Sequence, residues 1–110
     1  MIVYKKALLP DDSECIVHLL THENFLLPDF LDFHRTSFAI VTRIVNMNGE
    51  EVSEPAHSWI NPSFEYITGR QCLINIFKDD SQEYAGIYFF KDKQSAMDYE
   101  IPNLIKGGNS

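Results

Sequence analysis

The alternation of apolar and polar residues predicts that most of the chain forms short β-strands. Runs rich in apolar, β-branched and aromatic residues, bounded by Gly, Pro, Asn and Asp, are typical of strands. Such runs occupy residues 2–6, 15–20, 37–47, 51–59, 64–68, 72–77 and 86–90. The segment 26–34 breaks this pattern because it contains Pro28 and two acidic residues. We expect it to form a loop or a single helical turn over the core.

The longest run, residues 37–47, is predicted to be the central strand. Side chains in a strand alternate between its two faces. This places Phe38, Ile40, Thr42 and Ile44 on one face, and Ala39, Val41, Arg43 and Val45 on the other. The Asn48-Gly49 pair that follows is a strong hairpin signal. Residues 51–59 are therefore predicted to return beside this strand, at a sheet edge because Pro55 has no N–H to donate.

These patterns together predict a core and a fold class. The core is expected to combine apolar residues from three strands: Val17, Leu19, Phe38, Ile40, Ile44, Ile87 and Phe89. One helix is predicted after the last strand, with Asp92 as its N-cap and with Ala96, Met97 and Tyr99 docked on the sheet. We therefore predict an α+β fold that is mainly antiparallel. It has a curled or barrel-like sheet of about six to seven strands and a C-terminal helix.

Length and charge narrow the class of protein further. The chain has 110 residues, so we predict one globular domain over residues 1–105 and a flexible tail over residues 106–110. Its 16 acidic and 9 basic residues give a formal net charge of −7. Non-specific nucleic-acid binding and attraction to anionic membranes both need a basic surface, and neither is expected. With two cysteines and no readable signal peptide or membrane span, we expect a soluble cytoplasmic protein.

Residues spread over nearly the whole chain resemble a known family. In order, they are Tyr4-Lys5-Lys6, Arg35 with Ala39 and Val41, Gly49, Phe64 with Tyr66 and Gly69, and Gly86-Ile87-Tyr88-Phe89-Phe90 with Ala96 and Tyr99. This pattern resembles the uncharacterised small domain found beside pentapeptide repeats in large DNA viruses, phages and some bacteria. The resemblance implies a fold and a viral or phage context, but no reaction. Three positions depart from it: His34 stands where the family has Cys, Phe38 where it has Lys, and Tyr88 where it has His.

A second resemblance covers only the end of the chain. The strand at residues 86–90 and the helix after it are similar to the last strand and helix of small dimeric ferredoxin-like monooxygenases. Those folds need a long helix between their first two strands, and residues 19–35 are a poor candidate for one. We therefore rank this resemblance second.

Catalytic and metal-binding arrangements are not visible in the sequence. His18 and His22 could share a metal ion if they lay on one helix, but His18 falls in a predicted strand. His57 and Ser58 are adjacent in a predicted strand and so point to opposite faces. Both cysteines lie in apolar strands, where a thiol is usually inert. We predict no catalytic residue, no metal and no cofactor, and hence no enzyme.

Arginines are the scarcest charged residues, and they are candidate ligand-binding groups. A guanidinium can hold a phosphate or a carboxylate through two parallel hydrogen bonds. The candidates are Arg43 and Arg70, with Arg35 as a third, while Tyr66 and Trp59 are expected to stack on a base beside them. For each arginine taken alone, an ion pair with one of the 16 acids is the simpler explanation.

Two functions of different class follow from these observations. The first is a non-catalytic accessory protein of phage or viral type that acts as an adaptor, binding a host or phage protein with a basic surface through its acidic surface. The second is a small-molecule binder that sequesters a nucleotide signal between an arginine and an aromatic ring. The predicted sheet has edges to protect, which also predicts a homodimer.

Overall fold

The computed structural model describes residues 1–30, 33–59, 62–73 and 86–101, and its strands form two antiparallel sheets. The larger sheet has the order β7-β6-β1-β2-β5-β8. Its strands are β1 (Ile2–Leu8), β2 (Glu14–Leu20), β5 (Phe38–Asn46), β6 (Ala56–His57), β7 (Glu65–Tyr66) and β8 (Gln71–Leu73). The smaller sheet, in the order β3-β4-β9, contains β3 (Leu26–Phe30), β4 (Phe33–Thr36) and β9 (Ile87–Phe89). A short 3-10 helix, η1 (Glu23–Phe25), precedes β3, and the helix α1 (Lys93–Asp98) follows β9.

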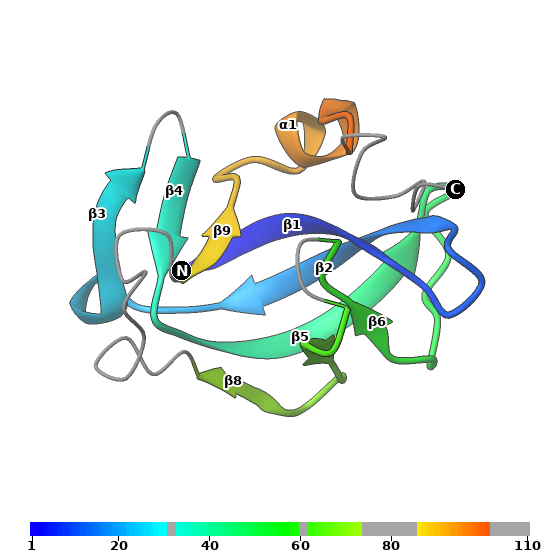
Figure 1. Cartoon of the computed structure of the whole chain (residues 1–110), viewed down its shortest axis with the longest axis horizontal. Coiled ribbons are helices and arrows are strands. Elements are labelled where there is room, and N and C mark those ends of the chain that lie inside the picture. The colour runs from blue at the N-terminus through cyan, green and yellow to red at the C-terminus, as the bar shows by residue number, and fades with distance from the viewer. Residues whose placement is uncertain (31–32, 60–61, 74–85, 102–110) are drawn as a thin grey trace.

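Figure 1 shows the long strands β1, β2 and β5 running side by side, with β3 and β4 at one end of them. The helix α1 lies over β1, away from β3 and β4. The prediction of a mainly antiparallel α+β fold with a C-terminal helix is confirmed. Asp92 caps the helix as predicted, because its carboxylate accepts a hydrogen bond of 2.9 Å from the backbone N–H of Ser95.

The barrel-like alternative is wrong. In the described part of the chain, nine strands divide between two sheets, and the larger sheet ends at β7 and β8 without closing on itself. A second strand group was not expected because residues 26–34 were predicted to be a loop or a helical turn. They contribute instead to β3 and β4, which pair antiparallel.

Pro28 explains why this hairpin escaped prediction. It lies within β3, which is an edge strand of the smaller sheet. The outer side of an edge strand has no neighbouring strand, so a proline, which lacks an N–H, is tolerated there. The register of β3 against β4 also shifts between Leu27 and Phe30, around this proline. In an edge strand with a proline and an irregular register, apolar and polar residues do not alternate regularly along the sequence.

The two faces of β5 are exchanged partway along the strand. The register pairs His18 with Arg43 and then Leu19 with Val41, which leaves Thr42 as an extra residue. Such a β-bulge shifts the alternation by one position. Thr42 and Arg43 are both exposed, and the strand then continues with its faces reversed relative to the predicted pattern.

The predicted core is therefore only partly right. Ile44 lies in the same buried cluster as Val41, although the alternation put them on opposite faces. Phe38 and Ile40 lie on the other face and are only half-buried, so their predicted place in the core is wrong. The remaining predicted core residues are confirmed: Val17, Leu19, Ile44, Ile87 and Phe89.

The predicted return strand at residues 51–59 is also wrong, although its turn forms. Gly49 has a φ of +88°, and its N–H donates to the carbonyl of Asn46 over 3.0 Å. Beyond the turn, Val45 and Glu51 form a single β-bridge, after which the segment leaves β5. Since Pro55 interrupts further pairing, only β6 follows, and it pairs with β1 and β7.

The remaining predicted strands form with other bounds: β1 and β2 extend beyond residues 2–6 and 15–20, whereas β7 and β9 are shorter than predicted. Residues 64–68 and 86–90 contain β7 and β9, and residues 72–77 overlap β8 at its described end. Residues 74–77 and the predicted tail at 106–110 lie outside the described residues. The division of the chain into a domain at 1–105 and a tail stays a prediction.

The larger sheet is covered differently on its two faces. On the inner face, β1, β2, β5 and β8 pack with residues of β9 in the main core. On the outer face, α1 covers one part of the sheet through Ala96, which packs with Ile16 and Val45. No helix in the described residues has the length and apolar character needed to cross a membrane.

Candidate functional site

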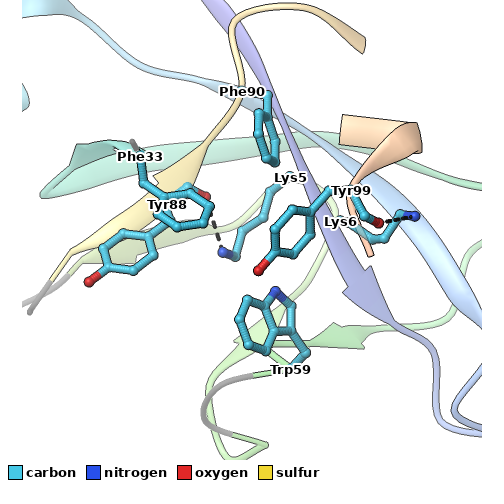
Figure 2. A pocket seen from close by; sticks show the side chains of 7 residues that line it. All are labelled: Lys5, Lys6, Phe33, Trp59, Tyr88, Phe90 and Tyr99. Carbon is cyan, nitrogen blue, oxygen red and sulfur yellow. Dashed lines mark hydrogen bonds between the residues drawn. The ribbon is translucent and has the colours of Figure 1, made fainter. Parts of the chain in front are cut away.

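A recess lies at the outer edge of β1, between two places where that edge is bridged. Tyr4 exchanges two backbone hydrogen bonds with Phe90, over 2.9 and 2.7 Å, and Leu8 pairs with His57 of β6. Between them lies a shallow recess of about 240 Å³ when the solvent at its mouth is counted, and its enclosed part has room for about one water molecule. Figure 2 shows the side chains that line it: Lys5, Lys6, Phe33, Trp59, Tyr88, Phe90 and Tyr99.

The two lysines reach this recess from opposite faces of β1. Neighbouring side chains in a strand point to opposite sides. Lys5 shares its side with Val3 and Ala7 of the core, and Lys6 shares the outer face with Tyr4. Both side chains are buried, at 5% and 4% exposure, because their methylene stems run along apolar surface before the amine reaches the edge.

The ammonium of Lys6 has three polar partners within the fold. Its ammonium donates to the carbonyl oxygens of Met97 and Tyr99, at 2.7 and 2.6 Å, and lies 3.2 Å from the carboxylate of Glu14. These two carbonyls are at the C-terminal end of α1, where cations stabilise a helix. In Figure 2 the amine of Lys6 points away from the recess. Lys6 is therefore a structural residue that fastens α1 to the sheet.

Lys5 has a different environment. Its ammonium donates to the carbonyl oxygen of Tyr88 over 3.0 Å and lies 5.8 Å from the centre of the Tyr88 ring. Among the described residues, no carboxylate lies within ion-pair distance of it. Burial lowers the pKa of Lys5 from 10.5 to about 8, so the amine is still mostly charged at pH 7. An ammonium can donate three hydrogen bonds, and among the described residues Lys5 donates one.

Aromatic rings form the walls around this amine. Phe33 stacks on Tyr88 at 5.5 Å between ring centres and meets Phe90 and Tyr99 edge-on. Trp59 contacts Tyr99 from the opposite side at 5.8 Å. Partial burial raises the pKa of the Tyr99 hydroxyl, which therefore stays protonated and can donate a hydrogen bond at neutral pH. The recess combines one cation with several flat apolar surfaces.

Of the ligand-binding residues predicted from the sequence, Trp59 lines this recess. Arg43 is exposed on the outer face and lies 3.2 Å from the carboxylate of Glu51. This ion pair is the simpler explanation that the sequence offered for each arginine. Arg70 is exposed and follows Gly69, whose φ of +86° is typical of a tight turn. A ligand-binding role for these arginines stays a prediction.

Two further candidates are buried elsewhere. Tyr66 is 1% exposed and belongs to the main core, so its ring is not available for stacking on a ligand. Arg35 is 8% exposed, and its Nε donates to the carbonyl oxygen of Pro28 over 2.7 Å. This contact ties β4 to the edge strand β3. Tyr66 is therefore unavailable to a ligand, and Arg35 is not a lining residue of the recess, although it pairs across β4 and β9 with Tyr88, which is one.

Both cysteines and His18 are packed within the fold. Burial raises the pKa of Cys15 to about 12 and that of Cys72 to about 11, which keeps both thiols protonated. His18 lies edge-on to Tyr4 with 5.0 Å between ring centres, and burial is the largest cause that lowers its pKa. Within the described ranges, no three His, Cys, Asp or Glu side chains are grouped as metal ligands would be.

Lys5 was not among the site residues predicted from the sequence, although Tyr4-Lys5-Lys6 is part of the family pattern. The available signal was two consecutive lysines inside an apolar strand, which runs from Ile2 to Leu8. Alternation requires one of them to face the core, and a lysine there is rarely buried without a partner. The bridge that brings Phe90 beside Tyr4 could not be predicted from spacing, because the two residues are 86 positions apart in the sequence.

Comparison with known proteins places the chain in a family but gives it no activity. No curated protein and no solved structure matches it significantly. One family model matches residues 1–96, which is most of the chain. The chain therefore belongs to the family of unknown function DUF5758.

Proposed function

We propose that the protein is a non-catalytic binding module and that Lys5 binds the phosphate or carboxylate group of a small anionic ligand, such as a nucleotide, whose planar ring lies outside the recess, at its mouth. The observation that carries this proposal is the buried ammonium of Lys5, which has one carbonyl partner and no ion pair in the described residues. A charge buried in this way is unfavourable, and an anion bound beside it would offset that cost.

The aromatic walls of the recess support a ligand that carries a planar group beside its anionic group. Stacked and edge-on rings offer flat apolar surfaces, and Trp59 and Tyr99 are placed to cover a planar group. Lys5 would supply charge-assisted hydrogen bonds to a phosphate or carboxylate oxygen. A nucleotide has both a planar ring and an anionic group. This favours the small-molecule binder over the adaptor that binds proteins through its acidic surface.

The test is a thermal-shift screen followed by calorimetry on the full chain. The panel contains linear and cyclic nucleotides, an aromatic carboxylate and inorganic phosphate. A ligand that binds the folded state raises the melting temperature with its concentration. We expect Lys5→Met to weaken binding at least tenfold, whereas Arg43→Ala and Arg70→Ala bind like the wild type.

These two arginine variants also separate the two candidate sites. If they abolish binding and Lys5→Met does not, the ligand occupies the site predicted from the sequence and the recess is wrong. If no member of the panel shifts the wild type at millimolar concentration, the proposal of an anionic planar ligand fails.

A second candidate function, a protein-binding adaptor, is favoured by where the basic residues lie. Of the nine basic residues, Lys5, Lys6 and Arg35 are buried, so the surface is more acidic than the formal charge of −7 indicates. Such a surface attracts basic partners and speeds their association. Phage or viral origin, a position beside pentapeptide repeats and a cytoplasmic location belong to this proposal.

Capture from a cell lysate at low and at high salt tests the adaptor function. A partner held by charge is retained at low salt and released at about 0.5 M salt, where exposed charges are screened. Neutralising the exposed acids Asp11, Asp12 and Glu54 as amides should reduce its capture. Retention that salt and these substitutions leave unchanged would argue against an acidic binding surface.

A further inference from the structure

One end of the outer face of the larger sheet is apolar and exposed. Ile2 pairs with Leu20, Leu20 with Ile40, and Phe38 with Leu73, so these side chains share one face across four adjacent strands. The ring of Phe25 extends the surface, 4.9 Å from that of Phe38. We call these six residues the apolar sheet face. Ile2 and Leu20 are each 42% exposed, Phe25 41% and Leu73 69%.

This exposure has a structural cause. On the same face, α1 covers Ile16 and Val45 near the other end of β2 and β5, and it is six residues long. Figure 1 shows α1 away from the end where β3 and β4 lie. The bulge at Thr42 turns Phe38 and Ile40 out of the core, onto the part of the face that the helix does not reach.

We infer that the apolar sheet face joins two copies of the chain in a symmetric dimer. A two-fold interface brings the same patch of each copy together, and a flat sheet face can pack on itself as the sheets of a β-sandwich do. Large exposed apolar patches usually mark such interaction sites.

Charge favours a second copy over a different partner. Each copy carries a formal net charge of −7, so two copies repel each other least where their contact contains no carboxylate. All six residues of the apolar sheet face are uncharged, and Tyr4 and His18 adjoin it on the same face. Arg43, which lies opposite His18 in β5, borders the face, and its charge is balanced by Glu51 at 3.2 Å. A basic partner would instead be drawn to the acidic surface.

The size of the face predicts a reversible dimer. The largest exposed apolar patch on a typical monomer is about 300–600 Å² and is often functional, whereas a standard interface buries about 800 Å² from each partner. Six partly exposed side chains fall in the lower of these ranges. We therefore expect a dissociation constant in the micromolar range rather than a permanent dimer.

Sedimentation velocity over about 5–500 µM protein tests this inference on the full chain. The average mass is expected to rise from 12.7 kDa toward twice that value as the concentration increases. Leu73→Lys and Leu20→Lys should each keep the protein monomeric over the whole range, because a charge in an apolar contact is strongly unfavourable. Both residues are exposed, so neither substitution should alter the fold, which circular dichroism of dilute protein checks.

Gln94→Lys on α1 is the matched control, since it adds the same charge at an exposed position outside the face. Added lysine lowers the net negative charge, so repulsion between copies cannot explain a loss of dimer in the face variants. A wild type that stays at 12.7 kDa throughout overturns the inference and leaves the face to another partner. Dimers that survive both face substitutions, or that Gln94→Lys also dissociates, overturn it equally.

Discussion

The two faces of the larger sheet bury neighbouring lysines but give their ammonium groups different numbers of polar partners. The outer face gives Lys6 two carbonyl oxygens at the end of α1 and the carboxylate of Glu14. The inner face gives Lys5 one carbonyl oxygen and aromatic rings. Since the two side chains are equally buried, burial does not distinguish the structural residue from the candidate ligand-binding residue. The number of partners does.

The largest expected difference between the faces concerns the apolar residues of β5. Ile44→Ala removes a fully buried side chain and should lower the free energy of unfolding by about 2–5 kcal/mol, through lost burial and the cavity left behind. Ile40→Ala truncates a half-buried residue on the outer face and should cost less than about 1 kcal/mol. Denaturant unfolding of dilute protein measures both values.

Equal costs for the two substitutions would contradict the bulge at Thr42, because regular alternation puts Ile40 and Ile44 on one face. Val41→Ala is the internal control. It lies in the main core beside Ile44, so its cost should follow that of Ile44→Ala in sign and exceed that of Ile40→Ala.

The fold could be predicted from the sequence where alternation is regular, and the exceptions have local causes. Strands β1, β2 and β9 and the cap at Asp92 were predicted because apolar spacing and capping chemistry are local signals. The bulge at Thr42 has no residue signature and reversed the faces beyond it. Pro28 hid an edge strand, and the pairing of β6 with β1 depends on contacts between distant segments.

The candidate site was predicted only in part for the same reason. Trp59 was predicted to stack on a base, and it lines the recess. The arginines were favoured because they are scarce and carry the right chemistry, but Arg35 is bound within the smaller sheet. Lys5 differs from Lys6 only through the partners that β9 and the end of α1 provide in the folded protein. No spacing in the sequence predicts how these distant segments pack.

A second way to sharpen the comparison is to remove Lys6. Lys6→Met loses two hydrogen bonds from a charged donor and leaves the carbonyls of Met97 and Tyr99 without this partner. We expect a loss of about 2–4 kcal/mol in the free energy of unfolding, together with weaker protection of α1 in hydrogen exchange. A loss below about 0.5 kcal/mol would mean that the helix is held by Ala96 and its apolar neighbours alone.

The smallest expected effect concerns the charge of Lys5 itself. Its pKa is lowered from 10.5 to about 8 in the folded protein, so between these pH values the unfolded chain binds more protons than the folded one. The free energy of unfolding therefore gains a contribution that rises with pH from about 8 to 10.5, of about 1–3 kcal/mol in total. Buried Tyr66 and Cys15 have raised pKa values and act in the opposite direction at high pH.

Comparing the wild type with Lys5→Met isolates this contribution, because the other groups titrate in both proteins. The difference in unfolding free energy between them should change with pH in favour of the wild type from about pH 8 upward, and stay constant below about pH 7. Binding of an anion in the recess should weaken over the same range, since a neutral amine no longer attracts it. A difference that does not vary with pH would show that Lys5 keeps an ordinary pKa and that the recess is wetter than its burial indicates.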